Sequence, residues 1–339
     1  MNAAIATNRR AYPSGLRPVD PRRDMSALAE LIELAFSENL DATGQNMVQN
    51  MRILGRLGWV GWLMGRLVLP PAAYPKGFVW EEDGRVVGNA SLLPVNRYPN
   101  RWVMANVAVR SEYRRQGIGK ELVNASIELV REHRGEIIIL QADRDAPGVE
   151  KMYTNQGFQS FSTRTQWTRR TVRTDHNLQF ADQVRSRTTE EWREEWDMAR
   201  RYHPEGIVWP FPPQIGLFQP TGWGQKTGRQ RGWNWVWEQD GRKLAFLSAK
   251  WNFERGHWRL IMITEPEAYG MVEDGLLTAC LAELQRVGGP CMLEYPADVA
   301  GEVLNKKGFA PARTLTWMGM RLTPHPTVQA CSGETTTKG

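Results

Sequence analysis

The sequence predicts an α/β protein built from two tandem copies of one domain. Strand-like and helix-like segments alternate along the first half of the chain, and the order begins again in the second half. In the first half, a glycine-bearing turn joins a short apolar strand to an amphipathic helix. A seven-residue segment also recurs 157 positions further on, with six of its seven residues unchanged.

The first copy can be followed element by element. A short strand near residues 16–19 precedes a helix that begins after Asp24, a predicted cap. The next segment, 44–67, has a mostly helical pattern interrupted by glycines, which is typical of a tightly packed helix. Two strands then flank Asp83-Gly84, a strong hairpin signal. The remaining predicted elements are a strand over 102–110, a helix over 117–133, a strand over 136–141, a helix over 148–156 and a strand ending near 168.

The turn between strand and helix favours a phosphate group. It follows the apolar residues Val107, Ala108 and Val109, and it runs through Arg114, Arg115, Gln116, Gly117, Ile118, Gly119 and Lys120. The first N–H groups of a helix lack partners inside the helix, and glycine lets a ligand approach the backbone. The spacing fits neither a Walker loop nor a dinucleotide turn. An ordinary helix start on a basic surface is the alternative.

The repeat divides the chain. Val79–Arg85 matches Val236–Arg242, and Gly157-Phe158 matches Gly308-Phe309. We expect copies at 15–168 and 178–322, a charged link between them and a disordered tail at 323–339. The second copy has Ala268–Glu273 in place of the turn 114–119, and its acids would repel a diphosphate. The second copy is therefore predicted to be degenerate.

Two motifs resemble those of the GNAT acyltransferase superfamily. Arg114-x-x-Gly117-x-Gly119 resembles its acetyl-CoA pyrophosphate loop, and Met152-Tyr153-x-x-x-Gly157-Phe158 resembles the end of its domain. The resemblance implies a mixed, mostly antiparallel sheet flanked by helices in each copy, with acetyl-CoA as acyl donor. It also implies that segment 44–67 covers the acceptor site.

The same resemblance assigns chemical roles. It implies a bulged strand whose backbone at Val107–Val109 contacts the pantetheine and the thioester oxygen, and a Tyr153 hydroxyl that protonates the departing sulfur. The alternative for Tyr153 is a core residue, and Leu304 stands at its place in the second copy. No general base is apparent, since Glu81 or Glu82 could act only through ordered water.

The predicted activity is transfer of an acetyl group from acetyl-CoA to the amine of a small molecule or peptide. Two alternatives stay open at this point: a non-catalytic acyl-CoA-binding regulatory module, and a nucleic-acid-binding or tRNA-modifying protein. Nucleic acid is the weaker reading, because no basic run is interleaved with aromatic residues. The tandem copies suggest a monomer that is an internal pseudo-dimer.

Composition limits the remaining classes of function. The net charge of +6 lies entirely in residues 1–170, which suits an anionic ligand such as CoA. The three cysteines stand apart and the five histidines show no metal-ligand spacing, so no metal is expected. The most apolar stretch, 59–69, is too short for a bilayer, and no signal peptide is visible. We therefore expect a cytoplasmic protein without membrane contact.

Overall fold

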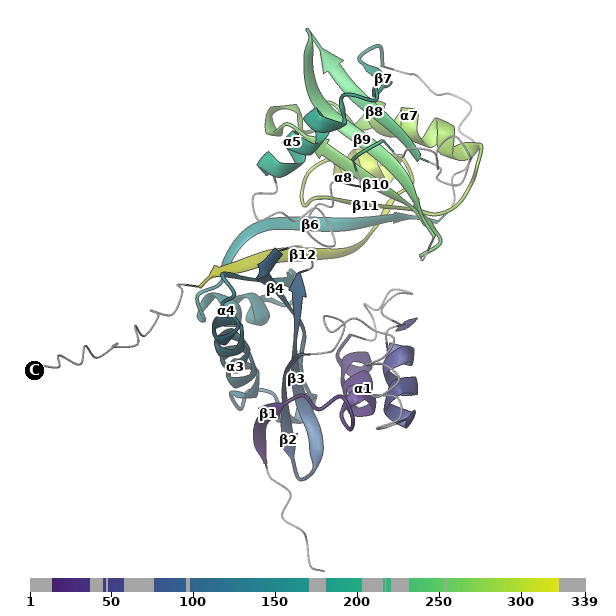
Figure 1. The fold of residues 1–339 in the computed structure, drawn as a ribbon. Coiled ribbons are helices and arrows are strands. Elements are labelled where there is room, and N and C mark those ends of the chain that lie inside the picture. The colour runs from purple at the N-terminus through teal and green to yellow at the C-terminus, as the bar shows by residue number, and fades with distance from the viewer. Residues whose placement is uncertain are drawn as a thin grey trace, which may run out of the picture. The chain divides into compact units, whose positions relative to one another are not determined.

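The computed structural model describes ten stretches of the chain, and Figure 1 shows its fold. They are residues 14–36, 45–46, 48–57, 76–95, 98–170, 181–202, 216, 218–220, 232–253 and 255–322. The chain divides into two compact units. One comprises Met1–Ser37, Val48–Leu140 and Gly319–Gly339, and the other comprises Glu38–Met47 and Gln141–Met318. The predicted tail at 323–339 lies outside the described residues.

The first unit contains a sheet with helices on both faces. Its strands are, in spatial order, β1 (Gly15–Pro18), β2 (Lys76–Glu82), β3 (Arg85–Val95), β4 (Tyr98–Val109) and the first part of β5 (Ile137–Asp143). All neighbours are antiparallel except β4 and β5, which run parallel. Helix α1 (Met25–Phe36) packs on one face and α3 (Ile118–Glu132) on the other.

A second helical stretch, residues 48–57, packs closely on α1. A Cβ on Gly55 would lie 2.1 Å from the Ser26 side-chain oxygen, so only glycine allows this approach. At Gly55 the prediction of tight, glycine-spaced packing is therefore confirmed. The other glycines and both tryptophans of segment 58–67 lie outside the described residues.

The second unit has a larger sheet of the same kind. Its spatial order is β12 (Ala310–Arg321), β6 (Gln159–Arg169), β11 (Cys291–Pro296), β10 (His257–Thr264), β9 (Arg242–Asn252), β8 (Gly232–Gln239) and β7 (Val184–Ser186). Helix α5 (Trp192–Tyr202) packs on one face and α7 (Glu273–Gln285) on the other. Two shorter helices are α4 (Pro147–Thr154) and α8 (Gly301–Lys306).

The order of elements confirms the tandem fold. The sequence β1-α1-β2-β3-β4-α3-β5-α4-β6 is repeated as β7-α5-β8-β9-β10-α7-β11-α8-β12. Both hairpin turns contain an aspartate with positive φ, 49° at Asp83 and 50° at Asp240. The register also shifts at equivalent places, after Trp80 in one copy and after Trp237 in the other. Each copy is thus a mixed, mostly antiparallel sheet flanked by helices, as predicted.

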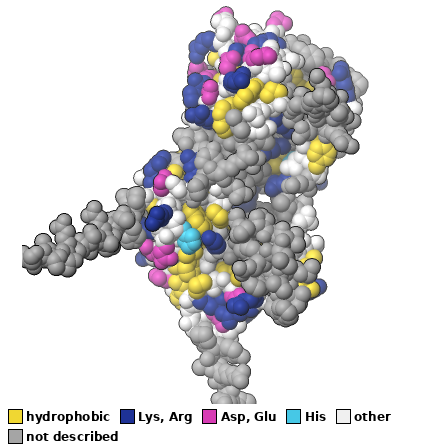
Figure 2. All heavy atoms as spheres, viewed as in Figure 1, with side chains coloured by type: hydrophobic (Ala, Val, Ile, Leu, Met, Phe, Trp, Pro, Cys, Tyr) yellow, Lys and Arg dark blue, Asp and Glu magenta, His cyan; other side chains and the backbone are white. Residues whose placement is uncertain are grey.

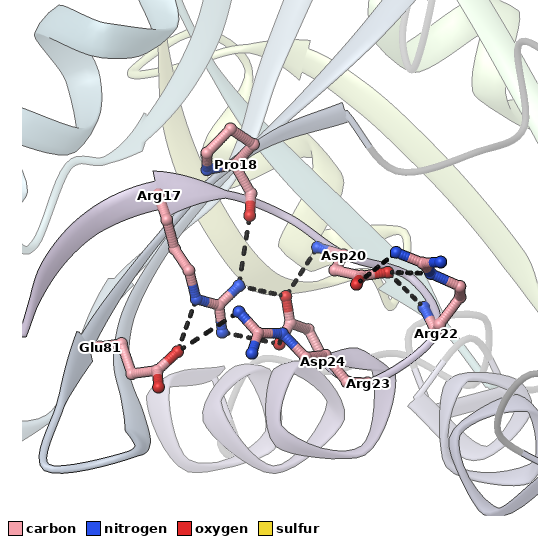
Figure 3. A network of polar contacts seen from close by, with 7 residues as sticks. All are labelled: Arg17, Pro18, Asp20, Arg22, Arg23, Asp24 and Glu81. Atoms are coloured by element: carbon pink, nitrogen blue, oxygen red, sulfur yellow. Dashed lines mark hydrogen bonds and ion pairs between the residues drawn. The ribbon is translucent and has the colours of Figure 1, made fainter. Parts of the chain in front are cut away.

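An arginine on the first strand ties it to the helix and the hairpin, as Figure 3 shows. The Arg17 guanidinium contacts Glu81 at 2.5 Å and Asp24 at 2.7 Å. The Asp24 carboxylate also accepts the N–H of Asp20 at 2.7 Å, so it braces the helix entry rather than capping α1 itself. Because Glu81 is buried and held by Arg17, it serves this contact rather than an acceptor amine.

The second copy repeats this arrangement. Arg185 on β7 contacts Glu191 at 2.6 Å and also pairs with Glu238, which corresponds to Glu81. The Thr188 N–H donates to Glu191 at 2.7 Å, which is one of the two bonds of a capping box. Strand β7 lies inside the predicted second copy, 178–322, but no strand was predicted there. The sequence signal was weak because β7 has only three residues.

The last strands of the two copies are exchanged. Strand β6 of the first copy pairs with β11 of the second, from Arg169 opposite Cys291 onward. Reciprocally, the Arg144 N–H, just after β5, donates to Thr314 O of β12 at 3.1 Å. The compact units therefore cut across the two predicted copies instead of coinciding with them.

A buried ion pair in the second copy gives a stability test. Arg187 pairs with Glu195, and Ser248 Oγ donates to the same carboxylate at 2.8 Å. Arg187→Met should cost about 3–5 kcal/mol in urea unfolding, because it leaves a buried charge without its partner. Burial raises the pKa of Glu195, so the folded state holds its proton at higher pH than the unfolded state.

The loss in Arg187→Met should therefore shrink as pH falls. The double variant Arg187→Met with Glu195→Met is the control, and it should recover much of the loss. Equal stability of Arg187→Met and the parent at neutral pH would contradict this role.

The surface of the described residues carries charges of both signs. On the face drawn in Figure 2, Lys and Arg side chains are interspersed with Asp and Glu. Such mixing does not produce the single-sign field typical of a nucleic-acid-binding face. Within the described ranges, no helix is long and apolar enough to cross a membrane.

Candidate active site

Strand β4 contains a bulge at the place where the resemblance implies one. Its register against β3 moves from Ser91 opposite Ala105 to Asn89 opposite Ala108, so two β4 residues face Ala90 alone. One of the two, Asn106, has a left-handed φ of 53°. A bulge bends a strand and redirects its peptide groups. It does so here directly before Val107.

Strand β4 parts from β5 shortly before the bulge. The parallel pairing runs from Arg101 opposite Ile137 to Val103 opposite Ile139 and ends there, whereas β4 continues to Val109. Within the described residues, no strand pairs with this edge after Val103. Peptide groups along such an edge can bond an extended ligand in the way a neighbouring strand would.

The turn after β4 exposes backbone donors at the start of α3. Gly117, with φ 84°, is the residue before the helix, and no side chain caps it. The first helical bond runs from Glu121 N–H to Gly117 O at 3.1 Å. In the described chain, the N–H groups of residues 116–119 donate to no backbone oxygen. A Cβ on Gly117 would meet nothing within 4 Å, so the space above the turn is open.

Side chains of the turn supply charge and anchoring. Arg114, Arg115 and Lys120 are exposed, and the Arg114 Nε also donates to Val109 O at 3.0 Å, which ties the turn to the end of β4. Ile118 is buried against Leu122 and β3, so it offers the ligand only its backbone. The arrangement of backbone donors, open space and positive charge suits a phosphate group.

Tyr153 lies on α4 in the second compact unit and is described within that unit. Its side chain is buried, and its ring meets Phe158 edge-on at 5.7 Å between centroids. Burial raises the pKa of the hydroxyl, so Tyr153 stays protonated at neutral pH. The Phe158 N–H donates to Tyr153 O at 3.1 Å, and Phe309 donates to Leu304 O in the same way at 2.9 Å. Leu304 is thus the structural equivalent of Tyr153, as predicted.

The corresponding turn of the second copy is closed from within. Glu273 is the first residue of α7 and is buried. Its Oε1 accepts the Gly270 N–H at 3.1 Å and the Tyr295 hydroxyl at 2.7 Å. The Tyr295 hydroxyl also lies 2.9 Å from Thr264 Oγ1. A carboxylate of the chain itself therefore lies in this turn and bonds one of its backbone donors.

This geometry corrects the alignment of the two turns by one residue. The Arg110 backbone N–H donates to Val87 O, and the Glu265 backbone N–H donates to Leu244 O in the same way. Arg110 and Glu265 are therefore equivalent positions in the two copies. Val272 then corresponds to Gly117, Glu273 to Ile118 and Asp274 to Gly119. The sequence comparison had placed Glu273 on Gly119. Glu273 also fills the site, whereas the sequence suggested only repulsion.

One residue near the bulge was not singled out from the sequence. Asn89 on β3 is fully buried, and its Nδ2 donates to Asn106 O at 2.8 Å. A signal was available, since an asparagine stands in the middle of the largely apolar strand β3.

Comparison with known proteins agrees with this geometry. Residues 60–158 match the Acetyltransferase (GNAT) family. A GCN5-related N-acetyltransferase from Sphaerobacter thermophilus has a similar structure, with a TM-score of 0.56, 14% identity, and coverage of 90% of this chain and 95% of that chain. A tandem GNAT protein from the clavulanic acid biosynthesis pathway gives a TM-score of 0.50 and 15% identity, covering 93% of this chain and 100% of that chain.

No curated protein matches the chain by sequence. At these identities the solved structures establish the fold, and the family match adds support for acyl transfer. The chain therefore has two tandem copies of the GNAT fold, and the first copy carries the match to the GNAT acetyltransferase family.

Proposed function

We propose that the first copy transfers an acetyl group from acetyl-CoA to an amine. The observation that carries this proposal is the turn between β4 and α3, where the N–H groups of residues 116–119 donate to no backbone oxygen and a Cβ on Gly117 would meet nothing within 4 Å. The diphosphate of CoA would bind these donors, with Arg114, Arg115 and Lys120 supplying positive charge. The pantetheine would extend along the edge of β4 that β5 leaves open.

The chemistry then needs a polarised carbonyl and a proton donor. Backbone N–H groups of Val107–Val109, next to the bulge, would bond the thioester oxygen and stabilise the charge that develops on it. The amine nitrogen would bond to the carbonyl carbon and give up a proton to water, and the C–S bond would break. Tyr153 would return a proton to the thiolate, a role supported by its motif, and its hydroxyl carries that proton at neutral pH.

The second copy would not take a second acyl-CoA. Its β10 pairs with β9 without interruption from His257 to Thr264, so it lacks the bulge. The buried Glu273 occupies the turn, and by strand register Tyr295 on β11 corresponds to Ala142 on β5. We infer one acyl-CoA site per chain.

Isothermal titration calorimetry of the full chain with acetyl-CoA tests the proposal. The expected result is saturable binding with one site per chain. Two sites would contradict the closed second copy, and absence of binding would contradict the acyl-CoA assignment. An acceptor screen that measures thiol release follows. Binding without release on any amine would instead favour the non-catalytic acyl-CoA-binding module.

A further inference from the structure

We propose that Asn89 is a positioning residue for acyl transfer, because its side-chain amide fixes the peptide group that presents the Val107 N–H to the thioester oxygen. This inference rests on the proposed function. Asn89 would touch neither acyl-CoA nor the amine. It acts through the bulge of β4.

The geometry of the peptide group carries the argument. Asn89 Nδ2 donates to Asn106 O at 2.8 Å, so this carbonyl points toward β3. In a trans peptide, the C=O of one residue and the N–H of the next point in opposite directions. The Val107 N–H therefore points away from β3, toward the edge of β4 where pairing with β5 has ended.

The same hydrogen bond has two further effects. A carbonyl that accepts a hydrogen bond makes the N–H of its own peptide group a stronger donor, because the amide is polarised. The bond also holds Asn106 at φ 53°, a conformation that costs energy for a residue with a Cβ. Asn89 thus both orients and strengthens the donor at Val107.

Asn89 is poorly explained as a packing residue. Asn106 O can only accept, so the end of the Asn89 amide that faces it is the nitrogen. Its other end, Oδ1, is buried and has no hydrogen-bond partner among the described residues. A buried acceptor without a partner is destabilising, and an apolar side chain of the same size would avoid this cost.

The second copy shows that the fold accepts such an apolar residue. Phe246 lies opposite Ile263 on β10, as Asn89 lies opposite Ala108 on β4. Phe246 is fully buried, and the strand beside it has no bulge. The polar residue therefore occurs in the copy with the open turn, and a phenylalanine occurs in the copy whose turn is closed by Glu273.

Asn89→Leu separates positioning from packing. Affinities for CoA and acetyl-CoA are measured by calorimetry, because only acetyl-CoA has the thioester oxygen. We expect the preference for acetyl-CoA over CoA to fall about 10-fold, the weight of one strong hydrogen bond. Affinity for CoA itself should change less than about 2-fold, since the turn at residues 114–120 is untouched.

A vibrational readout reports the bond directly. Acetyl-CoA labelled with 13C at the acetyl carbonyl should show a lower carbonyl stretching frequency when bound to the parent protein. In Asn89→Leu, this shift should be lost. The matched control is Ser91→Ala, which removes the other acceptor of Asn89 Nδ2, at 3.1 Å, and keeps the bond to Asn106. It should retain the parent shift.

Asn89→Val is the second variant, because it also removes the amide donor and its side chain is smaller than that of leucine. It should lose the acetyl-CoA preference as the leucine variant does. An unchanged preference and carbonyl frequency in a folded variant would overturn the inference. Failure of both variants to fold would also overturn it, in favour of a structural role. If the parent protein binds neither CoA nor acetyl-CoA, it is the proposed function that fails.

Discussion

Gly119→Asp is expected to abolish detectable binding of acetyl-CoA, with a loss of affinity of at least about 100-fold. The substitution places a carboxylate in the first turn of α3, where the diphosphate would lie, and like charges there repel. Gly119 is within the helix and does not have positive φ, so the change adds no backbone strain. Melting temperature should stay near that of the parent, and calorimetry with acetyl-CoA gives the affinity.

The second copy supplies the control. Asp274 is the structural equivalent of Gly119, and it is exposed. Asp274→Gly should leave the stoichiometry at one, because the buried Glu273 still occupies that turn. Normal affinity in Gly119→Asp would refute the assignment of the turn. Gly117→Glu should also abolish binding, but φ of 84° at Gly117 adds strain to its effect.

Tyr153→Phe is expected to lower turnover by about 100-fold or more, the usual weight of one acid–base group. The phenylalanine keeps the ring, so the edge-on contact with Phe158 is retained and only the hydroxyl is lost. Affinity for acetyl-CoA and melting temperature should barely change. Steady-state rates with a good acceptor amine, together with thermal unfolding, measure the two effects separately.

A packing role predicts the opposite pattern. Tyr153→Phe would then be nearly silent in rate, and only truncation to alanine would be costly, at about 3–5 kcal/mol. The fold tolerates a residue without a hydroxyl here, since Leu304 fills the equivalent place and is fully buried. Full turnover in the phenylalanine variant would remove Tyr153 from the mechanism and leave acyl-CoA binding intact.

Local signals predicted the elements well. Asp83-Gly84 marked a hairpin, and the structure has a turn with positive φ at both residues. The predicted helix over 117–133 is α3 at Ile118–Glu132. Such features depend on residues close together in the chain, where propensity and periodicity act directly. The turn at residues 114–120 was predicted for the same reason.

Features that depend on distant partners were not predicted. The bulge at Asn106 adds one residue to β4 that β10 lacks. The sequence alignment of the two copies did not allow for this extra residue, so it misplaced the second-copy turn by one position. The exchange of β6 and β12 has no local signature, because either strand has the alternation to pair with either neighbour. Glu273 closes the second turn from helix α7 with the help of the Tyr295 hydroxyl, which belongs to the distant strand β11.

The strand exchange has a consequence for the order in which the chain can fold on the ribosome. The Leu322 N–H donates to Glu136 O at 2.7 Å, and Arg313 pairs with Asp143, so the neighbourhood of β5 is completed only by the last described residues. At a synthesis rate of about 5–20 residues per second, β12 is made long after β5 has emerged from the ribosome. The nascent first copy must therefore wait with one edge of β5 unpaired, and the two copies mature together rather than one after the other.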